Sequence, residues 1–81
     1  NRRFAAYYLE LEPGSSWQSE PHLWGTREFI TVFSGSLQIR ADGRDISVSA
    51  GESVRFRGDT PHAYRNGGEE IVVLHMILYN P

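Results

Sequence analysis

Residues 51–66, GESVRFRGDTPHAYRN, decide the fold of this 81-residue chain. Val54 and Phe56 alternate there with two arginines, which is the period-two pattern of a half-buried strand with a charged outer face. Residues 58–61 combine Gly, Asp, Thr and Pro, so they form a loop, and His62 opens the next strand. This strand–loop–strand unit places a histidine at the mouth of a sheet.

Short apolar runs separated by turn residues continue over the rest of the chain, and no stretch has the pattern of a useful amphipathic helix. Runs recurring about every eight to ten residues with Gly or Pro turns indicate an all-β sandwich or barrel of antiparallel strands. Residues 37–40 are expected to pair back onto residues 28–33 across Gly35, and Asp42-Gly43 predicts a tight hairpin. The expected strands are 3–11, a short one around 17–18, 28–33, 37–40, 46–48, 54–57, 62–65 and 71–79.

Length and composition limit the function classes. The chain is long enough for one domain with a small core, its apolar content is 40%, and no apolar run approaches the roughly 20 residues of a membrane span. It has no cysteine and no signal peptide, which fits a cytoplasmic protein. The net charge is −2 and the eight basic residues, all arginine, are dispersed, so direct binding to nucleic acid is not expected. Because the chain starts with Asn rather than Met, we expect a domain cut from a longer protein.

A second group of polar residues precedes the strand at 28–33. Residues two apart on a strand share a face, so His22 and Trp24 are expected to point the same way, and a turn at residues 25–26 would bring Glu28 beside them. Apolar residues at even positions after Glu28 predict that its side chain faces the interior, where a buried carboxylate needs a partner. Together with His62, these side chains form the donor set of open zinc and non-haem iron sites.

The spacing of these residues resembles the two sequence motifs of the cupin superfamily, over nearly the whole chain. The first motif is present as Gly14, seven residues, His22-x-Trp24, three residues, Glu28, six residues and Gly35. The second is present as Gly51, five residues, Arg57-Gly58-Asp59, two residues, His62, three residues and Asn66. The resemblance implies a small antiparallel jelly-roll β-barrel, with residues 1–81 as a single cupin domain.

The resemblance also implies a divalent metal, zinc first and iron, nickel or manganese otherwise, held by His22, Glu28 and His62. Trp24 stands where many metal-binding cupins carry a further histidine, so it is expected to be a wall of the ligand pocket. Three alternatives remain open: Glu20 replaces the missing ligand, Trp24 closes the metal site and leaves an organic-ligand pocket, or both histidines are ordinary rim residues. For the ligand itself, we expect a hydroxyl from Tyr64 and, for an anion, a guanidinium from Arg57 or Arg65.

Within the superfamily, residues 25–28, 32–35 and 60–66 look like the C-terminal cupin domains of bacterial Xre-type helix-turn-helix transcriptional regulators. That likeness implies a sensor for a small-molecule effector, with DNA bound only through a separate N-terminal module. The alternative is a small metal-dependent cupin enzyme of dioxygenase or isomerase type. The chain has no nucleophile motif, and Tyr64 and Glu20 are the only candidate acids or bases, so no catalytic residue is assigned.

Two further predictions concern the terminal strand and His62. Residues 71–79 form the longest apolar run, which predicts a strand buried on both faces. Little chain is left to cover its second face, formed by Ile71, Val73 and Ile77, so we expect a homodimer. As a rim residue, His62 is expected to tolerate replacement by Ala with loss of metal or effector binding but not of the fold.

Overall fold

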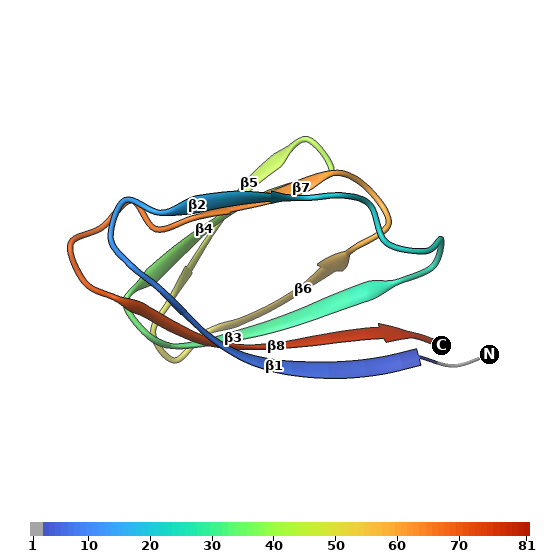
Figure 1. The fold of residues 1–81 in the computed structure, drawn as a ribbon, viewed down its shortest axis with the longest axis horizontal. Coiled ribbons are helices and arrows are strands. Elements are labelled where there is room, and N and C mark those ends of the chain that lie inside the picture. Colours follow the sequence, from blue (N-terminus) through green and yellow to red (C-terminus); the bar gives the residue numbers. More distant parts are fainter. Residues whose placement is uncertain (1–2) are drawn as a thin grey trace.

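The computed structural model describes residues 3–81, and Figure 1 shows their strands stacked in two layers. The alternation of apolar and polar residues forms strands as the sequence predicts. No helix in residues 3–81 is long and apolar enough to cross a membrane. The strands are β1 (Arg3–Leu11), β2 (Ser16–Ser19), β3 (Arg27–Ser34), β4 (Ser36–Ala41), β5 (Arg44–Ser49), β6 (Ser53–Arg57), β7 (His62–Arg65) and β8 (Val72–Asn80).

Each layer is a four-stranded antiparallel sheet. The first sheet has the order β1-β8-β3-β6 and the second has the order β2-β7-β4-β5. β1 pairs with β8 along its full length, from Arg3 opposite Asn80 to Leu11 opposite Val72, so the start of β1 lies beside the end of β8 (Figure 1). This all-β jelly roll is the predicted fold class.

The core lies between the two sheets. The even positions of β3 point inward as predicted, and Glu28, Ile30 and Val32 are fully buried. Burying a large aliphatic side chain contributes roughly 1.5–3 kcal/mol, which offsets part of the entropy lost by the chain. The buried apolar residues are Leu11, Ile30, Val32, Leu37, Ile39, Ala41, Val48, Tyr64, Val72, Leu74 and Met76.

The expected pairing of residues 37–40 with residues 28–33 is wrong, because β3 and β4 belong to different sheets. The chain passes from one sheet to the other at Gly35, which has a φ of +78°. A Cβ atom there would lie 2.9 Å from the carbonyl oxygen of Ile71, so the crossing requires glycine. The hairpin predicted at Asp42 and Gly43 is confirmed; both residues have positive φ, as a type I′ turn requires, and they join β4 to β5.

The terminal strand is buried on one face rather than on both. Val72, Leu74 and Met76 of β8 face the core, whereas the alternate residues are half-buried on the outside of the first sheet. Ile71 precedes the strand and is exposed. The register places aromatic residues of β1 and β3 beside these outward positions. We call this surface the outer apolar face, formed by Phe4, Tyr8, Phe29, Ile77 and Tyr79.

Candidate metal centre

Three elements bring His22, Glu28 and His62 together. His22 lies in the loop between β2 and β3, Glu28 is the second residue of β3, and His62 is the first residue of β7. One donor atom from each side chain lies within 4.8 Å of the others. Oε2 of Glu28 is 3.3 Å from Nε2 of His22 and 2.6 Å from Nε2 of His62. This arrangement can hold a divalent cation between two imidazoles and a carboxylate.

The ring of His62 has a defined orientation. Its Nδ1 lies 2.8 Å from the carbonyl oxygen of Thr60, which can only accept, so Nδ1 carries a hydrogen. In the neutral ring, Nε2 is therefore an acceptor, yet it faces Oε2 of Glu28, and neither atom makes an aligned hydrogen bond. Two acceptors at this distance repel each other unless a proton or a metal cation lies between them. Burial lowers the pKa of His62, but Glu28 and the Thr60 carbonyl outweigh it and raise that pKa above its ordinary value.

His62 is not the rim residue that the sequence suggested. Its side chain is fully buried and meets Phe56 edge-on, with ring centroids 5.7 Å apart. Tyr64 lies edge-on at 5.5 Å on another side of the ring. Replacement of His62 by Ala would therefore leave a cavity in the core, so loss of metal in that variant would not separate binding from folding.

Glu28 is anchored by Tyr64, whose hydroxyl donates to Oε1. Burial and the Glu28 charge together raise the pKa of Tyr64 far above its ordinary range, so the hydroxyl stays protonated. Trp17 packs against the Tyr64 ring with centroids 4.6 Å apart. Tyr64 shares the inner face with His62, as the sequence indicates, and its hydroxyl is used to orient the carboxylate.

Gly58 allows the chain to close over the cluster. A Cβ atom at this position would lie 3.2 Å from Oε2 of Glu28 and 3.3 Å from Cδ2 of His22. The Gly58 backbone also joins the two loops, because its carbonyl accepts from the His22 N–H at 2.9 Å and its N–H donates to the Thr26 carbonyl at 2.9 Å. A side chain at residue 58 would therefore crowd Glu28 and His22 by a few tenths of an ångström.

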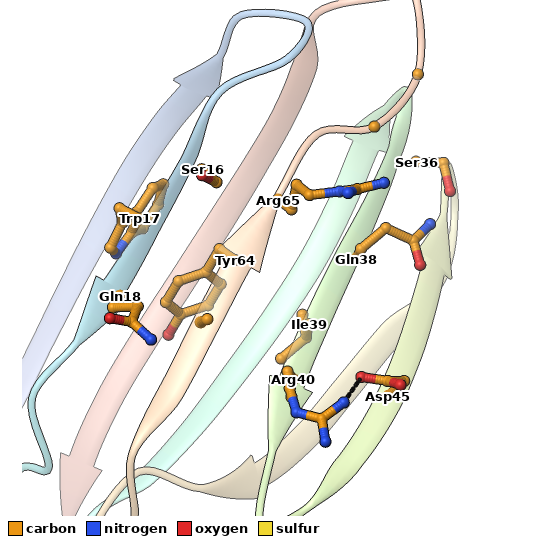
Figure 2. Close-up of a pocket in the computed structure, with 13 residues that line it drawn as sticks. Ser16, Trp17, Gln18, Ser36, Gln38, Ile39, Arg40, Asp45, Tyr64 and Arg65 are labelled. Atoms are coloured by element: carbon orange, nitrogen blue, oxygen red, sulfur yellow. Dashed lines mark hydrogen bonds and ion pairs between the residues drawn. The ribbon is translucent and has the colours of Figure 1, made fainter.

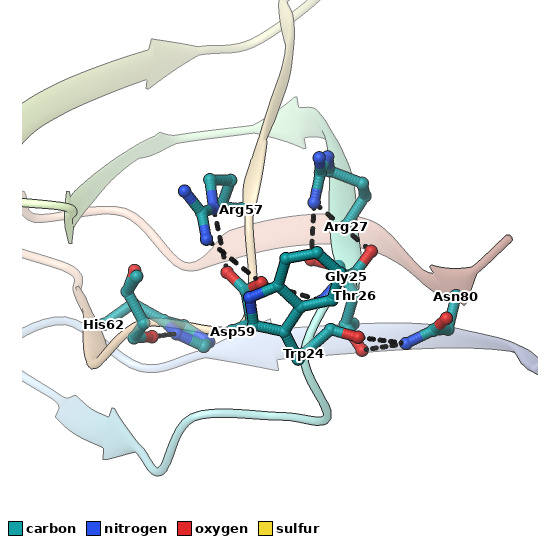
Figure 3. Close-up of polar contacts among 9 residues, drawn as sticks. Trp24, Gly25, Thr26, Arg27, Arg57, Asp59, His62 and Asn80 are labelled. Carbon is teal, nitrogen blue, oxygen red and sulfur yellow. Dashed lines mark hydrogen bonds and ion pairs between the residues drawn. The ribbon is translucent and has the colours of Figure 1, made fainter.

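Asp59 and Asn80 hold the loop that carries His22 (Figure 3). Oδ2 of Asp59 accepts the Gly25 N–H at 2.8 Å, and the Arg57 guanidinium donates to both carboxylate oxygens at 3.0 and 3.2 Å. The hydrogen bonds from Arg57 and then from Gly25 lower the pKa of Asp59 to about 2. Nδ2 of Asn80 donates to the carbonyl of Trp24 at 3.0 Å. In the sequence, Asp59 indicated only turn chemistry and Asn80 gave no signal.

The other predicted ligand-binding residues lie outside the cluster. His22 and Trp24 do not share a strand face, because residues 20–26 form a loop, and the Trp24 side chain is 85% exposed. Glu20 is exposed and is not among the clustered donors; it lines a hollow of about 280 Å³ that His62 also lines. Arg57 is engaged in its ion pair with Asp59, and Arg65 lies against Gly67.

A hollow of about 1020 Å³ lies along the second sheet (Figure 2). Residues of β2, β4 and β7 line it, including Tyr64 and Arg65, but none of the three donors does. A smaller pocket of about 330 Å³ reaches His22 from the ends of β1 and β8. We call this smaller cavity the mouth pocket.

The family model described as a cupin domain matches residues 7–78 of the chain. The chain belongs to the cupin family. The match covers β2 to β7 completely and most of β1 and β8, so it includes both loops of the cluster. Trp24 replaces the second histidine of the first cupin motif, and its side chain is exposed.

Relatives of this cupin include bacterial transcriptional regulators. It is 36% identical over 78 residues to the HTH-type transcriptional regulator SutR of Escherichia coli (strain K12), covering 96% of this chain and 44% of SutR. The cupin therefore spans less than half of that curated relative. The crystal structure of a cupin domain from an XRE family transcriptional regulator of Enterobacter cloacae is 37% identical, with a TM-score of 0.91, covering 96% of this chain and 82% of that one. The crystal structure of an HTH_3 family transcriptional regulator of Vibrio cholerae is 28% identical, with a TM-score of 0.89. The match covers 96% of this chain and 43% of that one.

Proposed function

We propose that this cupin is the small-molecule sensing domain of a bacterial transcriptional regulator and uses a divalent metal at His22, Glu28 and His62. One observation carries the metal assignment: a donor atom of each of His22, Glu28 and His62 lies within 4.8 Å of the others, and the side chains of Glu28 and His62 are fully buried. A divalent cation held there would offset the buried negative charge of Glu28. The regulator assignment is supported by relatives at 36% and 37% identity.

The three side chains fit a metal with nitrogen and oxygen preference. Neutral histidine and carboxylate are donors for zinc, iron, nickel and manganese, and three protein ligands leave a coordination position for a small molecule. The bound metal supplies positive charge and a place for one ligand atom. The chain supplies the rest: Thr60 fixes the tautomer of His62, and Tyr64 orients Glu28.

Sensing requires that the ligand bind two conformations of the domain with different affinity. The loop that carries His22 suits this role, because it lies outside the strands and its position is set by hydrogen bonds to Asp59, Asn80 and the Gly58 backbone. A ligand that contacts His22 would favour one arrangement of this loop. DNA would be bound by a separate helix-turn-helix module of the parent protein, which we place in the cytoplasm.

Metal content tests the proposal. Wild-type chain, His22→Ala and His75→Ala, purified without chelators or a histidine tag, are compared by elemental analysis. His22 is partly exposed, so its replacement should preserve the fold, and His75 lies on the outer side of β8, away from the cluster. We expect near-stoichiometric metal in wild type and His75→Ala, and at least about tenfold less in His22→Ala.

Absence of metal from wild type, even after soaking with zinc, iron, nickel and manganese salts, would overturn the metal assignment. In the parent protein, zinc added after chelation should also change the affinity for operator DNA. An unchanged affinity would count against metal-assisted sensing.

The enzyme alternative receives less support from the site. Tyr64, one of its two candidate acids, donates its hydroxyl to Glu28, and Glu20, the other, is not among the clustered donors. The described cluster therefore offers no free acid or base beside the three donors. A sensor needs neither group.

We also propose that two copies of this cupin associate through the outer apolar face. Phe4 is 72%, Tyr8 is 64% and Phe29 is 37% exposed, and with Ile77 and Tyr79 of β8 they span three adjacent strands. At about 4.8 Å between strands and about 3.3 Å per residue, a three-stranded face of seven or eight residues spans roughly 350 Å² in projection. A standard interface buries roughly 800 Å² per partner, so this face would form its apolar centre.

A further inference from the structure

We propose that the mouth pocket binds a small aliphatic carboxylate, which is the effector class of this domain. This inference rests on the proposed sensing function and assigns the ligand from residues outside the metal cluster. The pocket lies where the beginning of β1, the end of β8 and the loop before β3 meet.

The mouth pocket reaches one donor of the cluster, His22. The His22 side chain is 34% exposed, whereas those of Glu28 and His62 are fully buried. His22 lines the pocket directly. A molecule in this pocket therefore lies against the one accessible donor of the cluster.

The charge of the pocket selects an anion. Arg3 lines it and, among the residues that the structure describes, no Asp or Glu side chain does. Within the same part of the chain Arg3 has no ion-pair partner, so its guanidinium is available to a ligand. A guanidinium matches a carboxylate with two parallel hydrogen bonds, which favours a planar carboxylate over a single-point anion.

The remaining wall is mainly apolar and defines the body of the ligand. Ala5, Leu23 and Leu78 line the pocket, and Leu23 is 58% exposed although it is a large apolar residue. The volume of about 330 Å³ equals about ten water volumes, which admits a ligand of similar atom count. A carboxylate with a short aliphatic chain satisfies Arg3 at one end and these side chains at the other.

Calorimetric titration with 4-methylpentanoate and its amide tests this assignment. The two probes have the same aliphatic body, so a difference between them reports the charge. We expect the wild-type chain to bind the carboxylate at least about tenfold more tightly than the amide, because a charge-assisted bidentate contact is lost. Arg3→Gln should lower carboxylate affinity by a similar factor, and Leu23→Ser should weaken both probes equally.

Arg44→Gln is the matched control, because Arg44 is exposed on β5 and does not line the pocket. It should bind within about twofold of wild type. Amide NMR shifts caused by the carboxylate should map to residues 3–5, 22–26 and 78–80. Equal binding of the two probes, wild-type affinity in Arg3→Gln, or shifts elsewhere would each overturn the inference.

Metal content measured on the same samples separates the two proposals. A wild-type chain that holds metal but binds no carboxylate overturns the pocket assignment and leaves the metal centre intact. A chain that binds the carboxylate without metal supports the pocket assignment and overturns the metal-assisted part of the proposed function.

Discussion

At the scale of single residues, Glu28 organises the site. A fully buried carboxylate is costly unless its oxygens have partners, and Glu28 has Tyr64 on one oxygen and two imidazoles near the other. The partners come from a loop and from β7, a strand of the other sheet. One side chain thus couples the packing of both sheets to the geometry of the donors.

Tyr64→Phe tests this role. The change leaves the ring in place but removes the donor to Glu28, so a buried oxygen loses its hydrogen bond. We expect the free energy of unfolding of the chain to fall by about 1–3 kcal/mol, measured by urea denaturation. Tyr7→Phe, at a residue that is 45% exposed, should change it by less than about 0.5 kcal/mol. Equal effects of the two substitutions would contradict the role.

At the scale of elements, Asp59 joins two loops that are far apart in sequence. Its carboxylate bridges Gly25, 34 residues earlier in the chain, and Arg57 at the end of β6. The Asp59 side chain is only 2% exposed, whereas the otherwise similar pair of Arg40 and Asp45 is open to solvent. Asp59 therefore holds the His22 loop in place without touching a donor.

The lowered pKa of Asp59 predicts a pH dependence. Because the folded pKa is about 2 and the ordinary value is 3.8, the ionised carboxylate stabilises the folded state above about pH 4. This contribution is lost as the pH falls from about 4 towards 2. In urea denaturation at pH 7, Asp59→Asn should have a lower free energy of unfolding than wild type. The difference between the two free energies should narrow as the pH is lowered from about 4 towards 2. Asp45→Asn should have nearly the same free energy of unfolding as wild type at pH 7. A difference between Asp59→Asn and wild type that does not change with pH would contradict the stabilising role of the ionised Asp59.

Prediction from the sequence succeeded where the signal was local. Apolar runs bounded by turn residues located the strands, and Asp42-Gly43 predicted the hairpin because these residue types accept the positive φ values of that turn. The crossing at Gly35 was missed, because whether a glycine turn keeps the chain in one sheet depends on packing against Ile71 and Val72.

For the site, motif spacing identified the three residues that the structure brings together. It could not place Trp24, because the loop that contains it takes its shape from distant partners. Asp59 and Asn80 are such partners. They bond to Gly25 and Trp24 across 34 and 56 positions of the chain, and no periodic sequence pattern indicates contacts at such separations.

At the scale of the whole molecule, the two sheets have different outer surfaces. The first sheet presents the outer apolar face, whereas the second presents mainly polar side chains such as Gln38, Arg40 and Ser47. Large contiguous apolar patches on a surface mark sites of association. This asymmetry favours a dimer in which the two first sheets meet about a twofold axis.

Substitutions on the outer apolar face test the dimer by sedimentation at micromolar concentration. Tyr8→Glu and Phe29→Glu place like charges near the axis, so each should raise the dimer dissociation constant at least about tenfold. Both side chains are exposed, so the fold should survive. Ser47→Glu, on the exposed surface of β5, should leave association unchanged. A monomeric wild type would contradict this interface.

The pairing of the first strand with the last has a kinetic consequence. β8 lies between β1 and β3 in the first sheet. During synthesis, β1 and β3 therefore cannot pair with β8 until residues 72–80 have left the ribosome. Contacts between such distant segments slow folding, towards milliseconds to seconds for β-sandwiches. Asn80, which holds the His22 loop, belongs to this last strand. Complete assembly of the His22–Glu28–His62 cluster is therefore a late event that follows the closing of the first sheet.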